Sequence, residues 1–187
     1  MDAYSEDPNT ISLYPAELYW FGEDLTPEIG EDIDEKCKEI RAATKGWGTS
    51  EKRLIKALGN TDGKERRLIS IRYKEIYKKD LKKVMDSECG DGKFGTALQY
   101  AALGPVEAEC RMLKKAVDGV GTNEIMMYSI LCGRSNDDME LLKKTYYKKH
   151  GDDLLSRMSS EISGDMKKIL VAAVQVRMQK KENMAEK

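Results

Sequence analysis

The sequence predicts an all-α protein made of two consecutive units of about five helices each, preceded by an irregular N-terminal arm. Three observations carry this prediction. From residue 31 onward apolar residues recur at helical spacing, the chain repeats itself at the constant interval that separates Gly46 from Gly119, and no strand signal of any length is found. With 187 residues, of which 40% are hydrophobic, the chain can bury a sizeable core, as one domain or as two small ones.

Residues 1–30 differ in composition from the rest of the chain and predict an arm rather than a helix. They contain all but one of the 4 Pro residues and the aromatic patch ELYWF at 17–21. Residues 1–35 hold 11 Asp or Glu and no Lys or Arg, whereas residues 64–83 hold nine Lys or Arg against three acids. The arm could therefore lie on the basic segment or bind a protein partner, or the two stretches could be solvated independently.

The first unit, residues 31–103, reads as a series of helices joined by short turns. The apolar residues at helical spacing are, in chain order, Ile33, Cys37 and Ile40 up to Gly46, then Leu54, Ile55 and Leu58 up to the turn GNTDG, then Leu68, Ile69, Ile71 and Ile76 in a basic frame. Two short helical segments separated by SECGDG complete the unit.

The second unit, residues 104–178, opens at Pro105, a residue that suits the first turn of a helix. Residues 179–187 form a charged tail. The pairs of matching residues that share one repeat interval between the two units are Gly46 and Gly119, Gly48 and Gly121, Thr49 and Thr122, Glu51 and Glu124, Leu58 and Leu131, Tyr73 and Tyr146, and Met85 and Met158.

Charge and cysteine usage exclude several classes of function. A net charge of −1 gives no bulk basic surface, so nucleic acid is not expected as a partner. The 4 cysteines show no CxxC spacing and the chain has 1 histidine, which disfavours a zinc site and fits a cytoplasmic protein with reduced thiols. The longest apolar run, ILVAAVQV at 169–176, is too short to span a bilayer. No pair of residues is spaced for catalysis, so we expect no enzyme.

Two stretches imitate known motifs without meeting their requirements. Gly90, Gly92 and Gly95 spell GxGxxG, but no strand precedes them, as a dinucleotide-binding loop requires. The stretch DSECGDG begins like an EF-hand loop, yet it has Asp91 at the position that needs Gly and Ala97 at the position that needs Glu. Neither stretch predicts a binding site.

The loops KGWGT and DGVGT are the feature that most needs an explanation. Part of the pattern is helix punctuation, in which Gly ends one helix, Thr49 and Thr122 N-cap the next, and Glu51 and Glu124 complement its dipole. Punctuation does not explain the second glycine of each loop, or the bulky Trp47 at a loop tip. Nor does it explain why a Ser–Glu pair follows each Thr at the same distance, with Glu88 after Thr49 and Glu161 after Thr122.

A calcium site explains the loop and the distant Glu together. Calcium takes six to eight oxygens, commonly backbone carbonyls and a bidentate Glu, and a Gly-rich turn can aim several consecutive carbonyls at one point. Glu88 and Glu161 would supply one carboxylate to each site. With three carbonyls and one bidentate Glu, about two coordination positions stay open, so an oxygen from outside should raise the affinity.

These motifs resemble those of the annexin family. The segments KGWGT…SE and DGVGTNE…SSEISGD match the annexin calcium motif, and the resemblance extends over residues 31–178, with RSND and YKKHGDDLL also matching in the second unit. The resemblance implies five-helix repeats whose calcium loops lie on a convex face. It also implies that lipid phosphate completes the calcium coordination, so that the ion joins the protein to acidic phospholipid and the protein lies peripherally on membranes when calcium is high.

Carried over by position, the family's ligands fall on two sets of residues. The resemblance implies carbonyl ligands at Thr44, Gly46 and Gly48 with the Glu88 carboxylate, carbonyl ligands at Val117, Gly119 and Gly121 with the Glu161 carboxylate, and weaker sites at Thr49 with Glu51 and at Thr122 with Glu124. Trp47 and Val120 would then stand at loop tips that face the bilayer, where an indole is favoured.

The chain also departs from the family. It has two repeats where most annexins have four, so the expectation is either a homodimer or a more mobile half of the usual disc. Thr61 stands where the family has an arginine, whereas Arg134 is present in the second unit, so the first unit is expected to lack a buried ion pair. The alternative function is a calcium-independent interaction scaffold that uses the arm, including YWF at 19–21, and the basic segment; a nucleic-acid binder is more remote.

Overall fold

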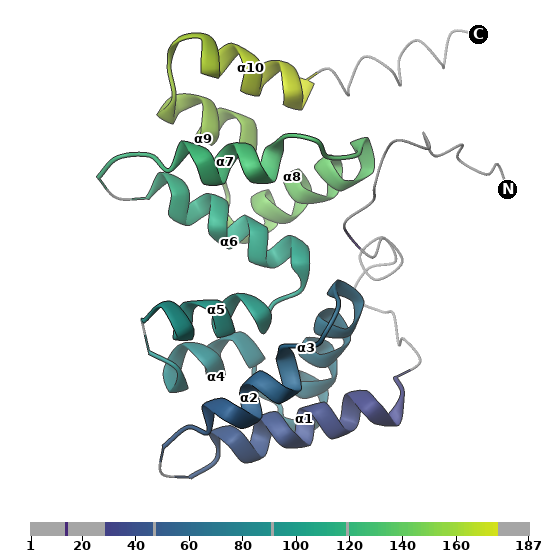
Figure 1. The fold of residues 1–187 in the computed structure, drawn as a ribbon. Coiled ribbons are helices and arrows are strands. Elements are labelled where there is room, and N and C mark those ends of the chain that lie inside the picture. The colour runs from purple at the N-terminus through teal and green to yellow at the C-terminus, as the bar shows by residue number, and fades with distance from the viewer. Residues whose placement is uncertain (1–13, 15–28, 47, 91, 119, 176–187) are drawn as a thin grey trace, which may run out of the picture. The chain divides into compact units, whose positions relative to one another are not determined.

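The computed structural model describes residues 14, 29–46, 48–90, 92–118 and 120–175, and these residues form helices without any strand (Figure 1). The all-α prediction is confirmed. The helices are α1 (Glu31–Thr44), α2 (Glu51–Leu58), α3 (Gly63–Tyr77), α4 (Leu81–Glu88), α5 (Lys93–Ala101), α6 (Pro105–Val117), α7 (Glu124–Leu131), α8 (Asn136–His150), α9 (Leu154–Glu161) and α10 (Gly164–Gln175).

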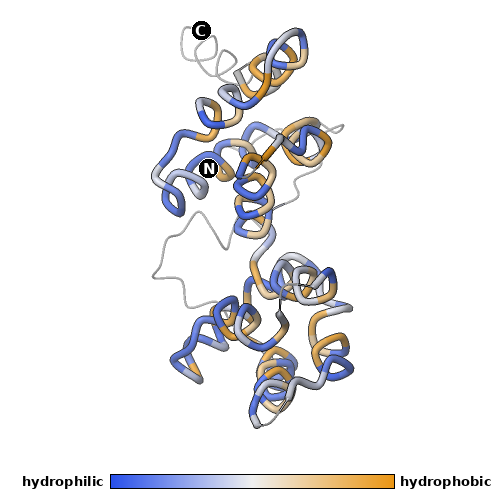
Figure 2. The backbone as a smooth tube through the Cα atoms, turned by 90° about the vertical axis from the view of Figure 1, so that its left-hand side faces the viewer, coloured by the Kyte–Doolittle hydropathy of each residue, from blue (hydrophilic) through white to orange (hydrophobic). Residues whose placement is uncertain are grey.

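The chain divides into two compact units, one running through Tyr14–Ala108 and the other containing the chain from Glu109 onward. In the first unit α1 packs against α2 and α3, and α4 packs against α5. The predicted helix face of Ile33, Cys37 and Ile40 is buried in this core. Figure 2 shows hydrophobic and hydrophilic segments alternating along the helices, as expected for amphipathic helices that each bury one face.

The internal repeat extends from sequence to individual hydrogen bonds. In the first unit the buried thiol of Cys37 donates to the carbonyl of Ile69, with Sγ 3.7 Å from the oxygen. In the second unit Cys110 donates to Leu142 at 3.8 Å. Both partners of the second bond stand at the repeat-equivalent positions of the first. Burial repeats in the same way for Tyr73 and Tyr146, Leu81 and Leu154, and Met85 and Met158.

Part of the basic segment is neutralised by acids of its own unit. Arg72 on α3 donates to both carboxylate oxygens of Asp34 on α1, at 2.6 and 3.0 Å. Arg67 donates to Glu107 at 2.8 Å. These guanidinium groups are therefore already used inside the unit. The predicted arm, including ELYWF, lies outside the described residues apart from Tyr14, whose side chain is buried, and the end of the arm at Ile29 and Gly30.

The expected difference between the units at Thr61 and Arg134 is present. Arg134 is buried, donates to the carbonyl of Ile130 at 2.6 Å and pairs with Glu109 on α6. Thr61 instead donates its hydroxyl to the carbonyl of Leu58 at 2.6 Å. The position equivalent to Glu109 is Lys36, which forms a half-exposed pair with Glu65 on α3. The first unit thus lacks the buried arginine pair. It has instead a more exposed pair, in which α1 carries the base where α6 carries the acid.

No helix in the described part of the chain is both long enough and apolar enough to cross a bilayer.

Replacing Arg134 by Ala should destabilise the second unit. Truncation removes a hydrogen bond to a buried carbonyl and leaves the Glu109 carboxylate without this partner, and losses of this kind cost about 2–3 kcal/mol. Urea unfolding followed by circular dichroism would measure the change. The matched substitution Thr61→Ala should cost no more than about 1 kcal/mol, because it removes one neutral hydrogen bond. Equal losses for the two variants would contradict this assignment.

Candidate functional site

The loop between α1 and α2 needs two glycines for its backbone conformation. Gly46 has φ of 121° and Gly48 has φ of 85°, both in the left-handed region that other residues avoid. The loop is closed by a hydrogen bond from the amide of Ser50 to the carbonyl of Ala43 at 3.0 Å. A tight turn therefore follows directly after the C-terminal end of α1, with the carbonyls of Thr44, Gly46 and Gly48 close together along the chain.

Thr49 joins this loop to a residue far along the chain. Its hydroxyl donates to the backbone carbonyl of Glu88 at 2.9 Å and lies 3.4 Å from a carboxylate oxygen of the same residue. Glu88 is the last residue of α4 and is half-buried. The end of the loop and Glu88, which the sequence separates, are thus in contact.

The second unit repeats this arrangement. Gly121 has φ of 87°, and the amide of Asn123 donates to the carbonyl of Ala116 at 2.8 Å. The hydroxyl of Thr122 lies 3.4 Å from the carbonyl of Glu161, the last residue of α9. In both units the loop threonine therefore lies against the distant Glu residue.

The predicted N-caps were wrong in both units. Ser50 precedes α2 and makes no side-chain cap hydrogen bond, while Asn123 caps α7 by accepting from the amide of Met126 at 3.0 Å. The reason is that the hydroxyls of Thr49 and Thr122 point to carbonyls in the neighbouring short helix instead. A tertiary hydrogen bond has replaced the local one that cap preference suggested.

The chemistry of the donors suits a hard cation. Helices α1 and α4 both end at the first loop, and the last carbonyls of a helix carry partial negative charge without intrahelical partners. Among the described residues, no ion pair joins Glu88 to a Lys or Arg, and its carboxylate contacts the neutral Thr49 hydroxyl. No cluster of three or more His, Cys, Asp or Glu side chains occurs in the described part of the chain, so a cation at the loop would need most of its oxygens from the backbone. Carbonyls with a single carboxylate fit calcium.

The remaining acids stand beside these donors. Glu51 and Glu124 are the first residues of α2 and α7, and both are exposed. Burial raises the pKa of the Cys89 thiol, and the negative charges of Glu88 and Glu51 raise it further. Glu88 and Glu51, which belong to different parts of the sequence, therefore both lie close enough to act on the same thiol.

The second site contains a cation of the protein itself. Arg157 on α9 donates to the Glu161 carboxylate at 2.5 Å and to the carbonyl of Val117 at 3.2 Å. Both acceptors are among the predicted ligands. Sequence reasoning missed this residue, because an Arg four positions before a Glu indicates only a local helical pair.

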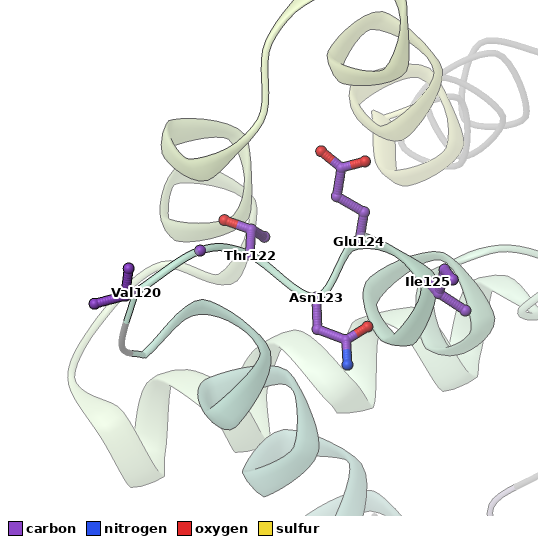
Figure 3. A pocket seen from close by; sticks show the side chains of 6 residues that line it. Val120, Thr122, Asn123, Glu124 and Ile125 are labelled. Atoms are coloured by element: carbon purple, nitrogen blue, oxygen red, sulfur yellow. The ribbon is translucent and has the colours of Figure 1, made fainter.

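The loop between α6 and α7 carries exposed apolar side chains beside its polar ones. Figure 3 shows Val120 at the outer part of the loop, followed by Thr122, Asn123, Glu124 and Ile125, which line a shallow surface depression. Val120 is fully exposed and Ile125 is 80% exposed. Ile125 was not predicted as a contact residue. The signal that could have found it is the comparison with the first unit, where the equivalent residue is the charged Lys52. Trp47 and Gly119 lie outside the described residues.

Comparison with known proteins agrees with these features. The annexin family model matches residues 35–100 and 108–173. Annexin A13 of Mus musculus is 40% identical over 146 residues, which cover 78% of this chain and 46% of that protein. The solved structure of annexin III has a TM-score of 0.69 at 30% identity, covering 79% of this chain and 45% of that one. A calcium-bound structure of annexin (Sm)1 has a TM-score of 0.66 at 28% identity, covering 76% and 43%.

The chain spans less than half the length of these relatives. Annexins are generally non-enzymatic, cytoplasmic proteins that bind phospholipid membranes peripherally and in a calcium-dependent way. The match extends over both repeats, and the described units contain the helices, loops and distant acids that the repeat motif requires. This chain therefore belongs to the annexin family.

Proposed function

We propose that this protein binds acidic phospholipid membranes in a calcium-dependent way through its two GxGT loops. The observation that carries the proposal is the hydrogen bond from each loop threonine to the distant Glu residue at a helix end. The bond lies where the loop carbonyls and one carboxylate would form the kind of donor set that calcium favours.

In the first site Thr44, Gly46 and Gly48 would present carbonyls and Glu88 would present both carboxylate oxygens. Val117, Gly119, Gly121 and Glu161 would do the same in the second. When bound, calcium supplies the charge that links the protein to an anionic headgroup, and about two of its six to eight coordination positions stay open for phosphate oxygens. Weaker sites would form at Thr49 with Glu51 and at Thr122 with Glu124.

The apolar loop residues would contact the membrane beside the headgroups. The exposure of Val120 and Ile125 next to the second site supports this role, because large apolar side chains at a loop tip gain free energy when they leave water. Trp47, at the tip of the first loop, is proposed to act in the same way, since an indole suits the membrane–water interface.

The competing functions have less support. The basic segment proposed for a calcium-independent scaffold or for nucleic acid uses Arg67 and Arg72 in ion pairs with Glu107 and Asp34. A protein partner of the N-terminal arm and a homodimer stay predictions.

The double variant Glu88→Gln/Glu161→Gln should lose calcium-dependent binding to phosphatidylserine vesicles. The amide keeps the shape of the side chain but removes the one negative charge in each donor set. Co-sedimentation with calcium and then with chelator measures the effect, and phosphatidylcholine vesicles serve as the lipid control. Retention of wild-type binding, or binding that does not depend on calcium, would contradict the proposal and favour a function of the N-terminal arm.

Thr49→Val should weaken calcium binding at the first site by about fivefold, because one hydrogen bond contributes about 1 kcal/mol. Valine has a similar shape but cannot donate to Glu88. Calorimetric titration with calcium in the Glu161→Gln background isolates this site. Thr122→Val, tested in the Glu88→Gln background, should have a smaller effect because its hydrogen bond is longer, at 3.4 Å. An unchanged affinity for Thr49→Val would remove the loop–helix bond from the explanation.

Val120→Ala should reduce the affinity for phosphatidylserine vesicles at saturating calcium by roughly fourfold to fifteenfold, since it removes two methylene-sized groups and each contributes about 0.8 kcal/mol when buried. Calcium affinity without lipid should stay the same, because the side chain is not a ligand. Ile76→Ala, a change of an exposed apolar residue on α3, provides the control and should bind vesicles normally. If both variants behave alike, the loop tip does not enter the bilayer.

A further inference from the structure

The two candidate calcium sites differ in one positively charged side chain. Arg157 lies one helical turn before Glu161 on α9, and one guanidinium nitrogen is 2.5 Å from the Glu161 carboxylate. The other terminal nitrogen is 3.2 Å from the carbonyl of Val117 at the end of α6. The guanidinium thus joins two oxygens from separate helices, and both oxygens belong to the donor set proposed for calcium.

The first unit has no counterpart of this cation. Val84 occupies the repeat-equivalent position of Arg157. The Glu88 carboxylate forms no ion pair with a Lys or Arg in the described part of the chain, and it lies 3.4 Å from the Thr49 hydroxyl. The acids differ too, because Asp118, 3.8 Å from Arg157, corresponds to Lys45.

A simple ion pair on one helix does not account for this geometry. In a helix the pairing of an acid with a base four residues later is the better orientation, and Arg157 precedes Glu161 in the weaker one. The contact with Val117 also joins residues 40 positions apart in sequence, one on α9 and one on α6. The Arg side chain therefore acts as a bridge across the second site, from α9 to the end of α6.

A guanidinium and a calcium ion cannot use the same oxygens together. Arg157 would have to leave Glu161 and Val117 before these oxygens coordinate a metal, and its side chain, 29% exposed, has access to solvent. Only molecules in which the bridge is broken bind calcium at this site. The apparent affinity therefore falls in proportion to the fraction of molecules whose site is open. The first site carries no such penalty.

We infer that Arg157 is a built-in competitor for calcium at the second site, so that the two sites fill in a fixed order. The inference rests on the proposed function and deepens it. The first site binds calcium with its carboxylate already available, and the second site binds only at higher calcium, when the guanidinium is displaced. Without calcium, Arg157 holds the loop to α9 in place of the ion.

The test compares the calcium affinity of the second site with and without Arg157. Calorimetric titration of the full chain carrying Glu88→Gln reports the second site, and addition of Arg157→Val copies the residue of the first unit. The expected result is a roughly tenfold higher affinity, as for a site that is open about one tenth of the time. Lys149→Val in the same background removes an exposed charge on α8 without touching the bridge, and should change the affinity by less than about twofold.

Thermal unfolding gives a readout that does not depend on calcium binding alone. In chelator, Arg157→Val should unfold at a lower temperature than the wild type, because the bridge between α9 and α6 is lost. Saturating calcium should then raise its unfolding temperature by more than it raises that of the wild type. An equal stability in chelator would mean that the bridge does not form in solution, and would overturn the inference.

The reciprocal substitution keeps the test decisive if Arg157→Val folds poorly. Val84→Arg in the Glu161→Gln background places the cation beside Glu88, and should weaken the first site by roughly tenfold. Unchanged or lower affinity on removing Arg157 contradicts the competitor role. Failure of the proposed function is distinct, because the Glu88→Gln/Glu161→Gln variant would then bind calcium as the wild type does.

Discussion

One hydrogen bond in each unit joins the parts on which the candidate sites depend. The hydroxyl of Thr49 donates to the carbonyl of Glu88, and Thr122 lies in the same relation to Glu161. The accepting carbonyl is at a helix end, where the backbone has no intrahelical donor, so the bond satisfies a group that otherwise needs water. Because the same threonine ends the glycine turn, the bond joins that turn to the helix end that carries the distant Glu. The proposed calcium ligands, which are far apart in sequence, depend on this contact to form one set.

The sequence was sufficient to predict the helices, the two units and the pairing of loops with distant acids, because these depend on periodicity and on repeat spacing. It was insufficient for the threonines and for Arg157. Cap preference is a local property, and it predicted Thr49 at a helix start where the hydroxyl in fact serves a tertiary contact. Likewise, the interval from Arg157 to Glu161 indicates a surface pair, whereas the contact with Val117 depends on how α6 and α9 pack.

The two units are alike in backbone and core but differ in their charges. Thiol hydrogen bonds and buried tyrosines recur at equivalent positions, as expected when close packing limits what a core residue can be. The charged pairs differ between the units, and both members of a pair differ together. Where the second unit joins Glu109 on α6 to Arg134 in the turn before α8, the first unit has Lys36 in place of Glu109 and joins it to Glu65 on α3. The differences between the two units therefore lie in their charged pairs rather than in their apolar core.

If main-chain oxygens are most of the calcium ligands, as proposed, this has a consequence for how such repeats diverge. A carbonyl is present whatever side chain its residue carries, so substitution cannot delete it while the glycine turn persists. On the proposal above, the properties of a site would then be set by very few side chains, namely the loop threonine, the terminal Glu and the residue one turn before that Glu. A single substitution at one of these positions could abolish calcium binding at a site or change its affinity. The stability of the surrounding helices would change very little. Repeats of this kind can acquire separate responses while remaining one architecture.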